Sequence, residues 1–137
     1  MRVLVCGGRH YGSSYTKWPC HPETREEELA NEQEAADERA LLVKMLDSLN
    51  ITVLIAGGAN GADKLAERWA DANGVKKEIY PVTPCDWGKF GKSAGYLRNK
   101  KMLDVGKPDK VVVFPGGKGT ALMRKLALMW GVEVIEA

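Results

Sequence analysis

Cysteine is scarce in this sequence. The chain of 137 residues has three cysteines, an odd number, and their spacing matches neither a disulfide framework nor a C-x-x-C metal site. Cys6 lies in an apolar run, which is typical of a small core residue. The pair Cys20-His21 would need two more ligands to hold zinc, with only His10 and Cys85 as further Cys or His candidates near a loop, so we expect no metal. Unpaired thiols are typical of a cytoplasmic protein.

Long hydrophobic runs are also missing. The first apolar run, Val3–Cys6, is too short for a signal peptide or a membrane span, and no later stretch approaches membrane-spanning length. We therefore expect a cytoplasmic location and no membrane partner. The length suits one domain over residues 1–137, which is large enough to bury a core without metal or disulfides.

Aromatic residues make up 7% of the chain and the formal net charge is only +2, but the charge is unevenly distributed. Residues 23–38 hold eight acidic residues and one arginine, a charge of −7 that leaves +9 for the rest of the chain. The acidic segment is interpreted as a solvated helix face. The remaining positive charge suits an anionic ligand. It is too weak to indicate nucleic acid, and few aromatics are available to stack on bases.

Short apolar runs alternate with helical patterns along the whole chain. The predicted strands are Val3–Cys6, Val53–Ala56, Glu78–Val82, Lys110–Phe114 and Val132–Ile135. The predicted helices run from Thr24 to Leu49, from Ala62 to a cap at Gly74, from Ala94 to Val105 and from Thr120 to Trp130. Residues 10–22 are predicted to be an irregular loop insertion. The alternation predicts an α/β class, a Rossmann-like three-layer α/β/α domain with a parallel sheet of about five strands.

Three of the predicted strands end in glycine pairs, Gly7-Gly8, Gly57-Gly58 and Gly116-Gly117. The carboxyl ends of parallel strands share one edge of the sheet, where ligands bind. Glycine allows a ligand to approach the main chain, and the helix that follows each loop directs free N–H groups at it. A phosphate-bearing ligand is therefore expected, the alternative being that these are only tight turns.

Two familiar nucleotide-binding motifs are absent. The first strand is followed by Gly7-Gly8-Arg9-His10-Tyr11-Gly12, which is not G-x-G-x-x-G. Gly91-Lys92-Ser93 has the tail of a P-loop, but Asp86 stands where its first glycine is required. A Walker-type NTPase and a standard dinucleotide dehydrogenase are excluded on this basis.

The remaining motifs resemble those of the YspA-related branch of the SLOG superfamily, whose members are common in bacteria and phages. The resemblance extends from Val3 to Val134. It is carried by Cys6–Arg9, Gly57–Asp63, Asp86-Trp87, Gly91–Gly95, Arg98–Met102 and Pro115–Thr120. The insertion at residues 10–22 departs from the compact pattern of the family.

The resemblance implies a nucleotide or nucleotide-derived ligand, related to NAD or ADP-ribose, in a sensor, sequestering or processing domain. It leaves two alternatives. One is a LOG-like phosphoribohydrolase acting on nucleoside 5′-monophosphates, and the other is DprA-like binding of single-stranded DNA. LOG enzymes use an arginine, matched here by Arg98, and a glutamate, whose position is occupied by Met123. A thioether cannot act as an acid or base, so enzymatic activity stays open, with Arg98 as the best catalytic candidate. A homodimer is expected because relatives often form one.

The expected ligand contacts combine backbone and charged groups. The glycines and Thr120 would hold phosphate, Arg9 and Arg98 would neutralise it, and Asp63 and Trp87 would contact ribose or base. Thr120 is either a phosphate ligand or a helix cap. The full set is Gly7, Gly8, Arg9, Gly57, Gly58, Ala59, Asn60, Asp63, Trp87, Lys92, Arg98, Asn99, Pro115, Gly116, Gly117, Lys118, Gly119 and Thr120.

Overall fold

A computed structural model describes residues 1–13, 23–82, 88, 91 and 93–137. Five parallel strands form one sheet in the spatial order β3-β2-β1-β4-β5. The strands are β1 Arg2–Cys6, β2 Val53–Ala56, β3 Lys76–Ile79, β4 Lys110–Val113 and β5 Glu133–Glu136. The helices that cover them are α1 Arg25–Asp47, α2 Ala62–Ala72, α4 Ser93–Asp104 and α5 Lys118–Met129. The predicted Rossmann-like α/β class is confirmed.

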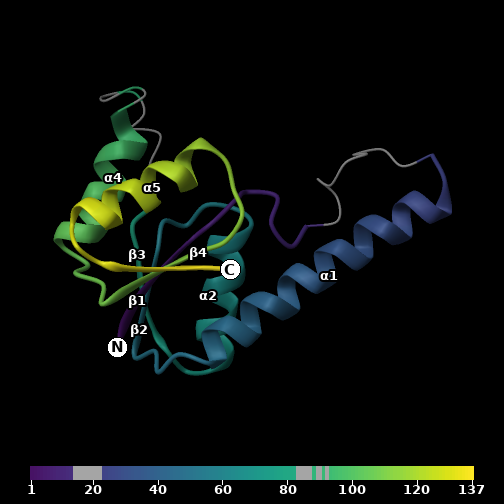
Figure 1. Cartoon of the computed structure of the whole chain (residues 1–137), viewed down its shortest axis with the longest axis horizontal. Helices are drawn as coiled ribbons and strands as arrows, with labels where there is room; N and C mark the ends of the chain where they lie inside the picture. Colours follow the sequence, from purple (N-terminus) through teal and green to yellow (C-terminus); the bar gives the residue numbers. More distant parts are fainter. Residues whose placement is uncertain (14–22, 83–87, 89–90, 92) are drawn as a thin grey trace.

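Successive residues of each central strand face two different cores. In β1, Val3 and Val5 belong to a cluster completed by α1 and α2, whereas Leu4 and Cys6 belong to one completed by α4 and α5. The two helix pairs therefore cover opposite faces of the sheet, which makes three layers (Figure 1). A strand buried on both faces needs apolar residues at every position, which explains the continuous apolar runs in the sequence.

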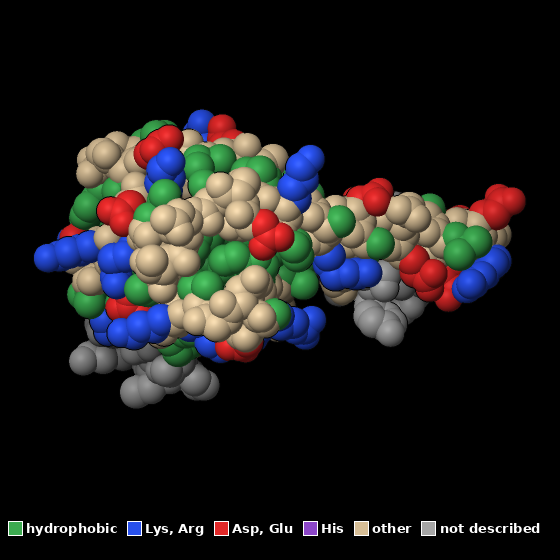
Figure 2. Space-filling view, turned by 90° about the horizontal axis from the view of Figure 1, so that it is seen from below, with side chains coloured by type: hydrophobic (Ala, Val, Ile, Leu, Met, Phe, Trp, Pro, Cys, Tyr) green, Lys and Arg blue, Asp and Glu red, His purple; other side chains and the backbone are tan. Residues whose placement is uncertain are grey.

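Helix α1 begins at the predicted capping box. The Thr24 hydroxyl accepts from the Glu27 N–H at 3.1 Å, while the Glu27 carboxylate accepts from the backbone N–H of Glu23 at 2.9 Å. The first half of this helix projects from the body, and acidic side chains lie toward its free end (Figures 1 and 2). The described part of the chain contains no helix with the length and apolar character needed to cross a membrane.

Two elements differ in position from their predictions. Strand β3 begins at Lys76, which pairs with Val53, and ends at Ile79. The predicted strand begins two residues later, at Glu78. Strand β3 lies at an edge of the sheet, where charged residues face solvent, and Pro81 has no N–H with which to continue the pairing. Helix α5 begins at Lys118 rather than Thr120, because the turn is complete at Gly117.

The predicted loop insertion at residues 10–22 is described only in part. Residues 10–13 form turns, in which the Tyr11 ring is buried against Phe114 with 5.2 Å between ring centroids. Residues 14–22 lie outside the described part of the chain.

Candidate ligand-binding site

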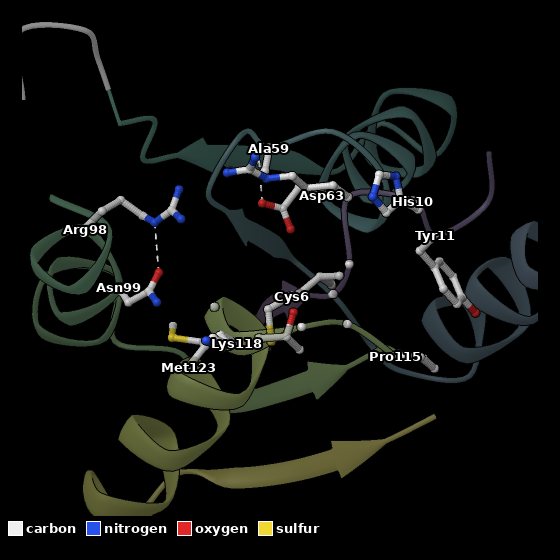
Figure 3. A pocket seen from close by; sticks show the side chains of 18 of the residues that line it. Cys6, His10, Tyr11, Ala59, Asp63, Arg98, Asn99, Pro115, Lys118 and Met123 are labelled. Carbon is white, nitrogen blue, oxygen red and sulfur yellow. Dashed lines mark hydrogen bonds between the residues drawn. The ribbon is translucent and has the colours of Figure 1, made fainter. Parts of the chain in front are cut away.

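A cavity of about 680 Å³ opens at the carboxyl ends of β1 and β4 (Figure 3). These strands are neighbours, with Cys6 opposite Val113, but the helices that follow them cover opposite faces of the sheet. Ligands of open α/β sheets bind at such a switch point. This central cavity is lined by residues 5–11, Glu38, Ala59, Asp63, 98–99, Met102, 115–120 and Met123.

The floor of the central cavity is backbone, because the loops after β1 and β4 lie in direct contact. The Gly8 N–H donates to the Pro115 carbonyl oxygen at 2.9 Å. A Cβ on Gly8 would lie 2.9 Å from that oxygen, and a Cβ on Gly116 would lie 2.3 Å from Thr120 Oγ1 and 2.6 Å from Gly8 N. Neither position has room for a side chain, so a ligand meets main-chain atoms there.

The first turn of α5 presents unpaired amides to the cavity. Gly117 is the N-cap and supplies no side-chain hydrogen bond to the helix. The first intrahelical bond runs from the Ala121 N–H to the Gly117 carbonyl oxygen at 3.0 Å. The amides of Lys118, Gly119 and Thr120 therefore have no acceptor within the helix, and they carry the positive end of its dipole. Such a helix start favours a phosphate or another anion.

Two hydrogen bonds hold the guanidinium of Arg98 beside the end of β2. Its Nε donates to Asn99 Oδ1 at 2.8 Å and its Nη1 to the Gly57 carbonyl oxygen at 3.0 Å. A Cβ on Gly57 would lie 2.4 Å from that Nη1, so glycine is required for this placement. Burial lowers the pKa of Arg98, and the positive charge of Arg9 acts in the same direction while Asp63 opposes both. An anionic ligand would relieve this partly buried positive charge.

Asp63 lies in the first turn of α2, where only 6% of its surface is exposed. Its Oδ2 accepts from the Ala59 N–H at 3.2 Å (Figure 3). Burial raises the pKa of Asp63 from 3.8 to about 6, although the Ala59 hydrogen bond and the charge of Arg98 act in the opposite direction. The carboxylate is both a loop-binding group and part of the cavity wall, so it can accept a hydrogen bond from a ligand hydroxyl.

The sequence profile described as YspA, cpYpsA-related SLOG family matches residues 1–89. The chain belongs to this SLOG family. It is also 42% identical over 140 residues to a protein described as Gene 61 protein of Mycobacterium phage D29. This alignment covers 98% of this chain and 94% of the phage protein. No solved structure matches the chain. Membership of the SLOG family suggests a role in binding a nucleotide-related ligand.

Most of the residues expected at the site of this SLOG chain do line the central cavity. They are Gly7, Gly8, Arg9, Ala59, Asp63, Arg98, Asn99, Pro115, Gly116, Gly117, Lys118, Gly119 and Thr120. Thr120 is not the cap of α5, since Gly117 holds that position, and Thr120 is one of the residues that line the cavity. Whether these residues contact a ligand stays a prediction.

Three expected residues do not line the central cavity. Gly57 packs directly against the guanidinium of Arg98, and Gly58, just after β2, packs against Ile79 and Pro81. Asn60 faces a neighbouring hollow on the α2 side. Trp87 and Lys92, expected to contact base and phosphate, lie outside the described residues.

Other lining residues were not expected from the sequence. Cys6 and Met102 come from the elements beneath the cavity, whereas His10, Tyr11 and Glu38 come from the first loop and α1. Cys6 could have been suspected, because it directly precedes the first glycine pair. Burial raises the pKa of its thiol to about 12, so it is protonated at neutral pH and is not a nucleophile.

Metal ligands and the LOG-type glutamate have no counterpart among the described residues. No group of three or more His, Cys, Asp or Glu side chains within them could hold a metal ion. Cys20, His21 and Cys85 are outside that part of the chain. Met123, at the glutamate position, is 1% exposed and packs with Leu126 in the core, so it offers the cavity no acid or base.

The raised pKa of Asp63 predicts a stability that falls as the pH rises. Between about pH 4 and pH 6 the folded chain retains a proton at Asp63 that the unfolded chain has lost, so ionisation opposes folding. Asp63→Asn keeps an acceptor for Ala59 but does not titrate. Relative to this variant, we expect the wild-type protein to lose up to about 3 kcal/mol of unfolding free energy between pH 4 and pH 7. Urea titrations across this range measure the difference, and parallel pH profiles would contradict it.

Proposed function

We propose that this protein binds a nucleotide or nucleotide-derived ligand of the NAD or ADP-ribose kind, as a sensor, sequestering or processing domain. The observation that carries the proposal is the meeting of two anion-seeking groups in one cavity. The unpaired amides at the start of α5 and the fixed guanidinium of Arg98 both line it, with Arg9 adding a second positive charge. A phosphate would lie at the start of α5, within reach of an arginine.

Binding without turnover agrees best with the side chains of the cavity wall. Met123 cannot serve as the acid or base of a LOG-type hydrolase, and the Cys6 thiol is protonated. Among the described side chains of the cavity, the carboxyl of Asp63 favours hydrolysis as a second candidate. A carboxyl whose pKa is about 6 exchanges protons readily near neutral pH, as a general acid or base must.

Ligand-induced stabilisation tests the proposal. We expect at least one member of a panel of AMP, ADP, NAD and ADP-ribose to raise the melting temperature, because a ligand that binds only the folded state stabilises it by about 2.7 kcal/mol at 100 times its Kd. A panel without any such effect at millimolar concentration would overturn the proposal. Chromatography of the same samples after prolonged incubation reports turnover, and loss of nucleotide that Asp63→Asn abolishes would favour the hydrolase.

A further inference from the structure

A second hollow of about 620 Å³ lies next to the central cavity, between the first loop, α1 and α2. Arg9, His10 and Tyr11 line both spaces, so the two adjoin each other. The second space is here called the cationic hollow. It is lined by residues 9–13, Arg39, Asn60, Gly61, Lys64, Leu65 and Arg68.

The described lining residues of the cationic hollow include four cations and no acid, although the Glu38 carboxylate accepts a hydrogen bond from the N–H of the lining Gly12 at 2.9 Å. Arg9, Arg39, Lys64 and Arg68 line it, and no Asp or Glu does. Lys64 lies 3.4 Å from Glu67 in an i,i+3 pair, and Arg39 donates to the Gly12 carbonyl oxygen at 2.8 Å. Neither Arg9 nor Arg68 forms an ion pair with a carboxylate in the described part of the chain. Like charges gathered around a concave surface repel one another, and a bound anion removes that repulsion.

The positions of these cations are set by the fold. Gly61, the N-cap of α2 with φ of 81°, lies so close to the first loop that a Cβ would be 2.1 Å from the Gly8 carbonyl oxygen. This contact fixes the backbone of Arg9 at the junction of the two spaces. Lys64 and Arg68 are four residues apart on α2 and therefore share one face of the helix. Both side chains are exposed at the rim, so they are accessible to a ligand and are not part of the hydrophobic core.

We infer that the ligand carries two separated phosphate groups, one at the start of α5 and the other in the cationic hollow, as in a dinucleotide. This inference rests on the proposed binding of a nucleotide-derived ligand, and it assigns that ligand two phosphates separated by a nucleoside, unlike the directly joined phosphates of NAD and ADP-ribose. Arg9 would contact the ligand where it passes from one space to the other. A mononucleotide would fill the central cavity alone and leave the cationic hollow empty.

Comparison of AMP with the linear dinucleotide pApA by isothermal titration calorimetry tests the inference. The two probes share one 5′-phosphorylated adenosine and differ by a second phosphate and nucleoside. We expect pApA to bind at least about tenfold more tightly than AMP, the effect of one further charge-assisted contact. In Lys64→Ala/Arg68→Ala this advantage should disappear while AMP binds as before. Lys125→Ala, which removes an exposed cation of α5 outside both spaces, is the matched control and should keep the advantage.

The outcomes separate failure of the inference from failure of the proposed function. If AMP and pApA bind equally, or if the double variant weakens both equally, the inference is wrong and the central cavity alone takes the ligand. If a ten-nucleotide deoxyadenylate binds more tightly than pApA, with a steeper salt dependence, the ligand is a single strand and the dinucleotide assignment is wrong. If none of the nucleotides binds, the proposed function itself has failed.

Discussion

Gly116→Ala is expected to weaken ligand binding at least about tenfold and to lower the unfolding free energy by ~1–3 kcal/mol, the range for a side chain forced into a packed site. The added Cβ would lie 2.3 Å from Thr120 Oγ1 and 2.6 Å from the Gly8 nitrogen. Both neighbours belong to the floor of the central cavity, so the loop after β4 must move away from the loop after β1. That movement would displace the amides at the start of α5 from the part of the cavity floor where the Gly8 N–H is hydrogen-bonded to the Pro115 carbonyl oxygen.

Gly95→Ala is the matched control for this substitution. Gly95 lies in α4, outside the central cavity, and a Cβ there meets nothing within 4 Å. Alanine is a better helix former than glycine, so this variant should be as stable as the wild-type protein or up to about 1 kcal/mol more stable. Urea unfolding and calorimetry with the stabilising nucleotide measure both effects. If Gly116→Ala and Gly95→Ala behave alike, the two loops do not need their close contact.

The strands and helices were largely predictable because each is encoded by local sequence. A buried parallel strand has a short, continuous apolar run, as at Val53–Ala56, and α1 has its own capping signal at Thr24 and Glu27. Strand β3 was displaced because its edge position allows charged residues such as Lys76 and Lys77, which a search for apolar runs passes over.

The site was predictable only as far as it follows from strand ends. All three glycine pairs follow strands, but strand order decides which of them meet. The switch point lies between β1 and β4, and Gly7-Gly8 and Gly116-Gly117 line the cavity there. The loop after β2, on the other side of β1, contributes Ala59 but not Gly57-Gly58. The close contact of Gly57 with Arg98, 41 residues away, depends on how α4 packs, and no local pattern encodes it. His10, Tyr11 and Glu38 were missed for the same reason, since the path of the first loop brings them to the cavity.

Arg98→Ala is expected to produce the largest loss of affinity, about 100-fold for any nucleotide that stabilises the wild-type protein. Its guanidinium is already fixed by Asn99 and by the Gly57 carbonyl, so binding does not have to immobilise a free side chain. Arg98→Lys should lose nearly as much, because an ammonium group lacks the planar arrangement of donors that serves both partners and a phosphate together. Lys100→Ala, an exposed cation on the same helix outside the cavity, should bind normally.

The same substitution has a second, independent readout at Asp63. The positive charge of Arg98 lowers the pKa of that carboxyl against the larger effect of burial. Removing the charge should therefore raise the pKa of Asp63 above its value of about 6, and NMR titration of the carboxyl carbon measures the change. A lost affinity together with a raised pKa would show that Arg98 acts through its charge inside the cavity. A lost affinity with an unchanged pKa would mean that the guanidinium lies elsewhere in solution, and that the variant weakens binding by disturbing α4.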